Sequence, residues 1–596
     1  MSHQSRLATS MAGSETPYIV FGIDFGTTFS GVSWKWSGGS ASPEPVRDWS
    51  TNGTPSQNRD SVKVPTSILY DSHGNVKLWG YIGDGHDGLL FQWFKLILSD
   101  EAQAKGGDKI DSTKELLKTL GKSVVDVVAD YLRKLWEHTL SIVRGKKINA
   151  TAFDNMQLRI VLTVPANWDH SANQLMKQAA AQAGMLEPRF AGPTTLRLVT
   201  EPEAAALAAW QESALEWQPD FKLGDSFVVC DAGGGTVDLI SYKVNSLSPL
   251  KLEESVESTA GFCGAVYLDE RFESAITTKI GLPAWNKISP AHKAKTMNDE
   301  WEHGIKRSYD GVKPSHFVEV RGYKPNRTMM GMGKRHSNTI EIHNAWLAAL
   351  FTPICNEIVD LVRAQCNEVR EVDSRSQFPK AILLVGGFGE NSYLYSQLVK
   401  AFRNDNISIL RPTGSWSAIS RGAVYKGLSN TAEEEAVTNH VSKFSYGVQY
   451  AAIFDASKHQ SEDKYLCKFT GRMLARNQLQ CKSQTVEYGW IRHIGNKYDL
   501  STITAEEIFI SDAKKPPTRK TNDVKKCCTI KTSFSDNIWE SLQEESRDPA
   551  SSPQGLSYSR RLEYGLKMSI AAGKLDWLVF RNGGTMGQAE IVVEYE

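Results

Sequence analysis

The chain lacks an excess of charge of either sign. Its 596 residues contain 68 Lys plus Arg and 68 Asp plus Glu, so the formal net charge at pH 7 is zero. Net charge therefore gives no bulk attraction to nucleic acid or anionic lipid, and we expect no nucleic-acid partner. Hydrophobic residues (41%) and charged residues (23%) have ordinary globular frequencies. The length exceeds what one hydrophobic core usually organises, so we expect several domains.

Long apolar runs and cysteine pairs are scarce. No segment approaches the roughly 20 apolar residues of a membrane span, and residues 1–17 lack the apolar core of a signal peptide. The 8 cysteines form no CxxC pair, which favours reduced, buried thiols. Adjacent Cys527 and Cys528 could ligate a metal, but no neighbouring His or Cys completes a four-ligand set. We expect a disordered N-terminus at 1–17, no membrane span, and a cytoplasmic location with the nucleus as an alternative.

Several catalytic signatures are missing too. The sequence has no Walker-type G-x-x-x-x-G-K-[ST] motif and no G-x-G-x-x-G after a strand, which disfavours P-loop and Rossmann proteins. It has no Ser-His-Asp arrangement, no H-E-x-x-H motif and no redox cysteine pair. Hydrolases and dithiol oxidoreductases of those classes are therefore disfavoured.

What is present is a repeated strand, glycine turn and strand. Residues 18–36 and 225–244 both show it, and a third strand ends in glycines near residue 387. Apolar spacing predicts helices at 114–142, 171–183, 269–279, 291–307, 344–366 and 392–402. We expect a basic loop at 313–335. Two glycine hairpins that open two mixed halves predict a duplicated α/β protein with a ligand between the lobes.

The character changes near residue 440. Short β-prone runs then alternate with polar loops, as in a small β-sandwich, and residues 514–526 and 544–554 are expected to be surface loops. We therefore predict a C-terminal, mainly-β domain at residues 440–596.

The two glycine turns carry the chemistry of phosphate binding. Residues 24–28 supply a carboxylate, a glycine and two hydroxyls, and residues 231–236 supply a carboxylate, three glycines and a hydroxyl, with Asp238 beyond. A triphosphate with Mg²⁺ needs backbone N–H groups, hydroxyls and carboxylates, and glycine permits close backbone approach. Either turn alone could join ordinary strands. Two such turns about two hundred residues apart predict a clamp around a nucleotide.

Four ordered segments resemble the heat shock protein 70 family of the actin-like ATPase superfamily. Its two phosphate loops are similar to FGIDFGTTFSGVSW and VVCDAGGGTVDLISY, its connecting segment to LTVPANWDHSANQLMKQAAAQAGM with LRLVTEPEAAALAA, and its adenosine loop to LLVGGFGEN. The resemblance covers about residues 18–427. It implies a duplicated, ribonuclease H-like nucleotide-binding domain at 18–430, with ATP or ADP and Mg²⁺ as cofactors.

The resemblance also implies roles for individual residues. Asp24 and Asp231 would orient the water shell of Mg²⁺, and Glu201 would order the attacking water or a metal-bound water, although a carboxylate at a helix N-terminus is also favoured by the helix dipole. Lys95 is the candidate for the lysine that approaches the γ-phosphate, and with Thr236 it completes the catalytic set. The nucleotide contacts implied are Asp24, Gly26, Thr27, Thr28, Phe29, Gly233, Gly234, Gly235, Thr236, Gly264, Lys306, Arg307, Gly386, Gly387 and Phe388.

Two details depart from the family pattern around the nucleotide. The acidic residue expected three positions before Lys306 is instead Glu302, four before, and the residues around Lys95 differ from the usual ones. On sequence alone, a pair such as Lys306 and Arg307 is more often part of a solvated helix face.

The C-terminal half departs further. No acidic, leucine-rich linker is visible near 430–445, and no long amphipathic helix follows the β-prone region as a lid. The form resembles the divergent heat shock 70 kDa protein 12 branch and its fungal relatives. The resemblance implies a slow ATPase coupled to lobe closure, with unfolded peptides, co-chaperones or exchange factors as partners. Alternatives are a nucleotide-dependent scaffold or sensor, and a small-molecule kinase with Asp169 as its base.

Overall fold

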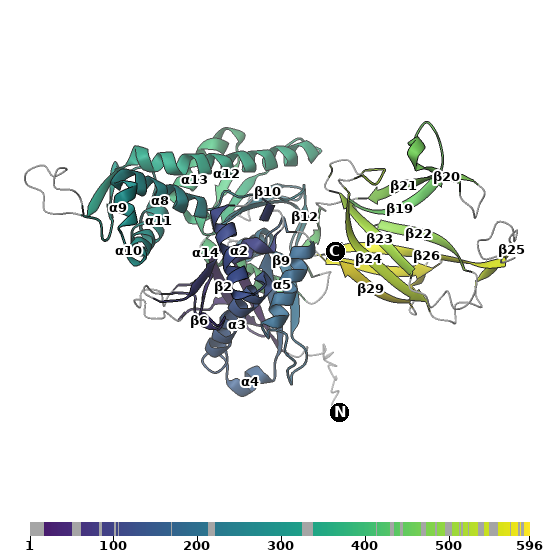
Figure 1. Cartoon of the computed structure of the whole chain (residues 1–596), viewed down its shortest axis with the longest axis horizontal. Helices are drawn as coiled ribbons and strands as arrows, with labels where there is room; N and C mark the ends of the chain where they lie inside the picture. The colour runs from purple at the N-terminus through teal and green to yellow at the C-terminus, as the bar shows by residue number, and fades with distance from the viewer. Residues whose placement is uncertain are drawn as a thin grey trace, which may run out of the picture. The chain divides into compact units, whose positions relative to one another are not determined.

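The structure is a computed structural model that divides into two compact units, Met1–Asn439 and His440–Glu596 (Figure 1). It describes residues 17–49, 61–82, 86–99, 103–104, 107–168, 170–212, 221–324, 338–412, 414–429, 434–441, 445–466, 472–482, 486–494, 504–511, 513, 517–521, 524–534, 542–546, 558–571, 574–581, 584–585 and 589–595. The predicted N-terminal disorder falls almost wholly on residues 1–16, outside this set.

The first lobe of the first unit is built on a six-stranded sheet in the order β3-β2-β1-β8-β9, with β4 paired to β2. Its strands are β1 (Tyr18–Phe25), β2 (Phe29–Trp36), β3 (Glu44–Pro45), β4 (Val64–Pro65), β8 (Gln157–Val164) and β9 (Thr195–Thr200). β1 is antiparallel to β2 and parallel to β8, which confirms the first predicted hairpin. All eight residues of β1 are buried, so helices cover both faces of the sheet.

The second lobe repeats this plan. Its seven-stranded sheet has the order β17-β16-β10-β11-β12-β18, with β13 paired to β11. The strands are β10 (Ser226–Ala232), β11 (Val237–Leu247), β12 (Leu250–Glu254), β13 (Thr259–Gly261), β16 (Ala381–Val385), β17 (Ser408–Leu410) and β18 (Val437–Asn439). β10 and β11 form the second predicted hairpin, and β16 lies parallel to β10 as β8 does to β1. The two α/β halves therefore share one topology around their glycine turns.

Helices α6 (Glu201–Glu212) and α14 (Ser415–Leu428) join the lobes, because one core cluster contains residues of both helices and both sheets. Two glycines allow close backbone contacts, one between α14 and α6 and one between α14 and β1. A Cβ at Gly422 of α14 would lie 1.6 Å from the carbonyl oxygen of Ala204, and a Cβ at Gly22 of β1 would lie 2.1 Å from that of Ser420. No larger side chain fits at either contact without moving an element.

The expected single helix at 114–142 is wrong, since two helices occupy that range. α2 (Asp108–Leu120) ends at Gly121, whose φ of 64° is left-handed, a conformation that glycine adopts readily. Ser123 then accepts from the backbone N–H of Asp126, whose side chain accepts from the Ser123 backbone, and this capping box starts α3 (Val124–Val143). Apolar spacing continued across the break, but the Gly and Ser cap signals decide the structure.

The remaining helices agree with the predictions only in part. Helices lie close to the ranges predicted at 171–183, 269–279, 344–366 and 392–402, the range 291–307 is divided into three shorter helices, and the helices at 150–154 and 282–286 were not predicted. These remaining helices are α4 (Ala150–Asp154), α5 (His170–Gln182), α8 (Val266–Ile280), α9 (Leu282–Asn286), α10 (Pro290–Lys295), a π-helix η4 (Thr296–Ile305), α11 (Lys306–Ser308), α12 (Asn344–Val372) and α13 (Ser392–Phe402). The first lobe also carries a small sheet of β5 (Ser67–Tyr70), β6 (Val76–Trp79) and β7 (Leu89–Gln92), followed by the 3₁₀ helix η2 (Phe94–Leu98). The predicted basic loop is only partly a loop: β14 (Ser315–Glu319) pairs with β15 (Thr339–His343), and residues 325–337 lie outside the described set.

Helix α12 qualifies the expectation of no membrane span. By length and composition it is apolar enough to cross a membrane, and it is the one such helix in the described part of the chain. One face, including Phe351, Ile358 and Val362, packs into the core of the second lobe. A core helix of a folded lobe passes the same test, and these contacts favour that interpretation.

The second unit consists mainly of strands. One sheet has the order β20-β21-β19-β23-β24-β29 and the other β22-β26-β27-β28, with β25 paired to β26. Their bounds are β19 (Ser445–Ile453), β20 (Lys464–Leu466), β21 (Met473–Lys482), β22 (Val486–Ile494), β23 (Thr504–Ser511), β24 (Lys525–Phe534), β25 (Gln543–Ser546), β26 (Tyr558–Ala571), β27 (Lys574–Arg581), β28 (Gly584–Thr585) and β29 (Ala589–Tyr595). The predicted surface loops at 514–526 and 544–554 are partly strand, because β24 starts at Lys525 and β25 ends at Ser546.

Candidate functional site

The two glycine turns meet tip to tip. A Cβ at Gly234 would lie 2.2 Å from the Thr28 hydroxyl oxygen, and a Cβ at Gly235 would lie 3.1 Å from Thr27 Cγ2. The first turn is tight, since a Cβ at Gly26 would lie 2.2 Å from the carbonyl oxygen of Phe29. Hydroxyls of one turn therefore face the backbone of the other, which is the arrangement expected of a clamp for phosphate groups.

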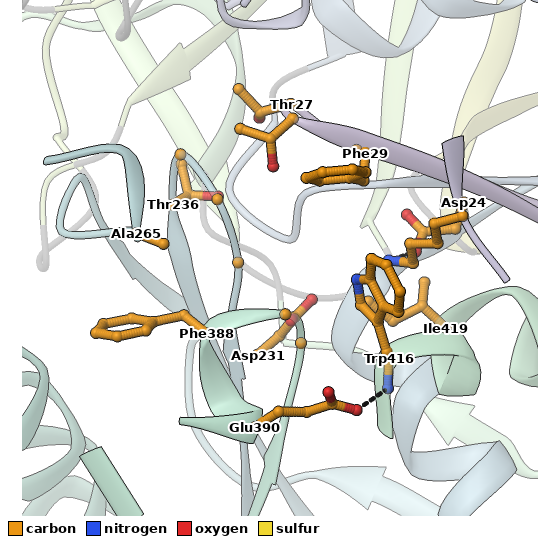
Figure 2. Close-up of a pocket in the computed structure, with 18 of the residues that line it drawn as sticks. Asp24, Thr27, Phe29, Asp231, Thr236, Ala265, Phe388, Glu390, Trp416 and Ile419 are labelled. Atoms are coloured by element: carbon orange, nitrogen blue, oxygen red, sulfur yellow. Dashed lines mark hydrogen bonds and ion pairs between the residues drawn. The ribbon is translucent and has the colours of Figure 1, made fainter. Parts of the chain in front are cut away.

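A cavity opens beside this contact, with an empty volume of about 1120 Å³ that includes its open mouth. In Figure 2, Thr27 and Thr236 lie near one another at one end, Phe388 and Ala265 on one side, and Trp416 and Ile419 on the opposite side. Fourteen of the fifteen predicted nucleotide-contact residues line it, as do Glu201 and Lys95. The full lining is Asp24, Gly26, Thr27, Thr28, Phe29, Lys63, Lys95, Glu201, Asp231, Gly233, Gly234, Gly235, Thr236, Ala265, Glu302, Lys306, Arg307, Gly386, Gly387, Phe388, Glu390, Asn391, Trp416 and Ile419.

Gly264 is the predicted contact that does not line the cavity. A Cβ there would lie 2.5 Å from the carbonyl oxygen of Gly234, and its N–H donates to the carbonyl of Gly235 (3.3 Å). The next residues, Ala265 and Val266, donate to Gly233 (3.1 Å) and Gly234 (2.8 Å). Gly264 therefore supports the second turn from behind, and its neighbour Ala265 reaches the cavity instead.

Buried carboxylates surround the phosphate end. Asp24 and Asp231 are each the last residue but one of their strands, β1 and β10, and Asp238 lies opposite Asp231 in the β10–β11 register. Burial raises the pKa of Asp231 well above its usual range, and the carboxylates of Glu201, Asp238 and Asp24 add to the rise. Burial, followed by Glu201, raises the pKa of Asp238 to about 7. Burial and the neighbouring carboxylates both favour the protonated forms, and a cation among them would favour the ionised forms.

The donor set fits a divalent cation with its water shell. Asp231 Oδ1 is buried and has no hydrogen-bond partner among the described residues. A Cβ at Gly386 would lie 2.3 Å from this oxygen, so glycine keeps the space beside it open. Mg²⁺ prefers oxygen ligands and keeps several of its waters, and Asp24 and Asp231 could hold those waters.

Two lysines enter this acidic group. Lys95 Nζ lies 2.5 Å from Glu201 Oε1, and both side chains are at least nine-tenths buried. Lys95 lies in η2, and its ammonium approaches the rings of Phe25 (5.7 Å to the centroid) and Trp168 (5.5 Å). Burial raises the pKa of Glu201, and the nearby Lys95 opposes that rise. Lys63 forms a second buried ion pair, with its Nζ 2.6 Å from Asp24 Oδ2.

The other end of the cavity is aromatic. The guanidinium of Arg307 lies 4.9 Å from the ring centroid of Trp416, and Phe29 meets that ring edge-on at 5.7 Å. Glu390 Oε1 accepts from the Trp416 backbone N–H (3.0 Å, dashed in Figure 2) and from Ser415 Oγ (3.1 Å). The carboxylate thereby caps α14 and fixes the start of the helix that carries Trp416. Rings and a guanidinium at this end suit a nucleotide base.

Lys306 is buried, not on a solvated helix face. Its ammonium lies 2.7 Å from Asp269 Oδ1 and 2.6 Å from Glu302 Oε2. Glu302 lies in the π-helix η4, whose turn holds more residues than an α-helical turn, so an acidic residue four positions earlier still lines the cavity beside Lys306. Asn391 Nδ2 donates to the Lys306 carbonyl (2.8 Å) and ties the residues after Gly387 to this helix.

Comparison with known proteins agrees with this geometry. The chain is 25% identical over 541 residues to heat shock 70 kDa protein 12A of Mus musculus, covering 77% of this chain and 76% of that protein. It is 24% identical over 524 residues to heat shock 70 kDa protein 12B of Homo sapiens, covering 74% and 73%. The chain is a divergent member of the heat shock protein 70 family. No protein-family model matches it.

The chain also matches chaperone HscA proteins over a shorter range. The chaperone protein HscA homolog of Laribacter hongkongensis (strain HLHK9) is 37% identical over 250 residues, covering 40% of this chain and 32% of that protein. Membership of the heat shock protein 70 family implies an actin-like, two-lobed ATPase fold. The two α/β halves with their mixed sheets agree with that fold.

Sequence reasoning missed part of the lining of this cavity. Lys63, Trp416 and Ile419 line the cavity although they lie outside the four segments that resemble the family, and Glu390 and Asn391 line it although they were not predicted as contacts. Trp416 and Ile419 are brought there by α14 from a position far from both glycine turns in the sequence. Glu390 and Asn391 are the last two residues of the segment LLVGGFGEN, so that segment was the available signal for both.

Proposed function

We propose that this protein binds ATP, with Mg²⁺, in the cavity beside the two glycine turns. The observation that carries the proposal is the meeting of these turns within an acidic group that contains two lysines. The relationship to heat shock 70 proteins supports ATP binding. We further propose slow ATP hydrolysis coupled to lobe closure, and a chaperone-like activity. The similarity to heat shock 70 proteins supports this proposal as a general class of activity.

Each side chain in the cavity would have a role that follows from its position relative to the phosphates. The hydroxyls of Thr27, Thr28 and Thr236 and the N–H groups of the second turn would donate to phosphate oxygens. Mg²⁺ would supply neutralisation of phosphate charge when bound. Glu201, at the start of α6, would orient a water for attack, and Lys95 would stabilise charge as phosphate leaves. Catalysis would then consist of positioning and electrostatics.

An ATPase assay on the full chain, with and without an unfolded peptide, tests the proposal. We expect slow ATP turnover that falls in Glu201→Ala and Asp231→Ala. Turnover stimulated by peptide would support a chaperone-like activity. No turnover by the wild type, with no change in these variants, would refute hydrolysis, and no ATP binding in excess Mg²⁺ would refute the whole proposal.

A nucleotide-dependent scaffold is the second candidate. Beyond residue 440, the described residues form strands, loops and one 3₁₀ turn, η8 (Ser461–Asp463). Among them there is no long helix that could act as a lid over a bound peptide, and this favours a scaffold over a chaperone. Tight ATP binding with negligible turnover would establish this candidate. The small-molecule kinase alternative depended on Asp169, which lies outside the described residues. A cytoplasmic location is also part of the proposal, and the buried thiols of Cys230, Cys355 and Cys366 support it.

A further inference from the structure

Lys63 is a buried lysine at the carboxylate that would face the metal. It directly precedes β4, lines the cavity, and its Nζ lies 2.6 Å from Asp24 Oδ2. The side chains of Lys63 and Asp24 are only 7% and 2% exposed. A lysine is rarely this buried unless a partner compensates its charge, so the pair is a built feature of the site.

The strand next to Asp24 makes room for this lysine. Gly31 of β2 is the register partner of Asp24, and a Cβ at Gly31 would lie 3.0 Å from Lys63 Cγ. The aliphatic stem of Lys63 therefore passes over a glycine to reach the carboxylate. The Lys63 carbonyl accepts from the hydroxyls of Tyr81 (3.0 Å) and Ser61 (2.7 Å), which fixes the backbone from which the stem extends.

The charge of Lys63 acts on the whole acidic group. Four carboxylates, those of Asp24, Glu201, Asp231 and Asp238, stand against the ammonium groups of Lys63 and Lys95. With every group ionised, the sum is −4 + 2 = −2, and removal of Lys63 makes it −3. Lys63 also opposes the rise in pKa of both Glu201 and Asp231. A polyphosphate that enters without a metal is repelled less because Lys63 is present.

We propose that Lys63 is a built-in cation that takes over part of the charge neutralisation otherwise supplied by Mg²⁺, so that the site retains substantial affinity for ADP without divalent metal. The inference rests on the proposed nucleotide site. Lys63 acts through Asp24 and is a positioning residue for the charges around the phosphates.

ADP binding to the full chain, measured by titration calorimetry in excess Mg²⁺ and again in excess EDTA, tests this proposal. The readout is the ratio of the two dissociation constants, which a general packing defect would not change. For the wild type we expect metal removal to weaken binding about tenfold or less. For Lys63→Met we expect a loss of about a hundredfold or more, because one unit charge near the phosphates is removed. Lys63→Arg should restore most of the metal-free affinity, and Lys400→Met, on an exposed part of α13, should behave as the wild type.

The outcomes separate the two proposals. Equal loss on metal removal in the wild type and Lys63→Met would overturn the role of Lys63 while leaving nucleotide binding in place. Absence of ADP and ATP binding by the wild type in Mg²⁺ would overturn the nucleotide site itself. If Lys63→Met does not fold, Asp24→Asn replaces it. That change removes the carboxylate that Lys63 compensates, so ADP affinity in EDTA should hold or tighten, and a weakening there would contradict the proposal.

Discussion

The contact between α14 and α6 gives a prediction whose sign is unusual. Replacing glycine by alanine inside a helix normally stabilises it by up to about 1 kcal/mol. At Gly422 the new Cβ would lie 1.6 Å from the carbonyl oxygen of Ala204 and 2.3 Å from its carbonyl carbon. Ordinary contact begins at 3.4 Å, so the helices must separate by about 2 Å (3.4 − 1.6). Overpacking of this kind costs about 3 kcal/mol, so Gly422→Ala should destabilise the first unit by about 2 kcal/mol or more.

The assay is denaturant unfolding followed by tryptophan fluorescence, read as the midpoint of the transition of the first unit. Gly389→Ala is the matched control, because a Cβ there would meet its nearest neighbour, Leu384 Cγ, at 3.4 Å, which is ordinary contact. The control should unfold near the wild-type midpoint while Gly422→Ala unfolds earlier. An unchanged or later midpoint for Gly422→Ala would show that α6 and α14 are not in backbone contact.

Three further predictions concern the cavity. Glu201→Gln and Asp231→Asn should each lower ATP turnover by about a hundredfold or more, while ATP affinity stays within about tenfold of the wild type. Turnover assays and calorimetry measure the two quantities. If turnover and affinity fell by the same factor in a variant, its residue would have a role in binding only. The raised pKa of Asp238 predicts that metal-free, nucleotide-free protein loses stability as the pH rises from about 4 to about 7, because the folded state then binds more protons than the unfolded state. Asp238→Asn should flatten that slope in thermal melts, and an unaltered slope would assign it to other groups. Trp416→Ala should weaken ATP binding by about tenfold or more and Trp416→Phe much less, since loss of base stacking costs about 1–3 kcal/mol; equal binding by all three proteins would place the base elsewhere.

Local signals determined what the sequence could predict. The two hairpins were predictable because a glycine turn between β-rich runs is encoded within about twenty residues, and α13 matches its expected range because its apolar spacing is uninterrupted. The 114–142 range failed because apolar spacing continues across Gly121 while the cap residues end one helix and start another. β21 was not among the β-prone runs because half of the residues in MLARNQLQCK are polar and they do not alternate regularly with the apolar ones.

The site residues that share one turn were predictable from the sequence. The site residues that tertiary packing brings in one at a time were not. Asp24, Thr27 and Thr28 come together on a single turn, so their grouping needs no tertiary information. Lys63 reaches Asp24 only because β4 pairs beside β2 and Gly31 leaves space for its stem. Trp416 reaches the cavity at the start of α14, which two glycine contacts hold against β1 and α6. Such pairings depend on strand order and helix packing, which residue spacing does not encode.

The π-helix η4 has a consequence for how this chain has diverged. An extra residue in an α-helix would rotate everything beyond it by about 100° and turn Lys306 and Arg307 away from the cavity. Confined to a wider turn, the same insertion leaves the downstream register intact. η4 therefore marks a place where the gene could gain a codon without loss of the ligand-facing residues. Sequence alignments with relatives should open a one-residue gap within Thr296–Ile305 and close it before Lys306.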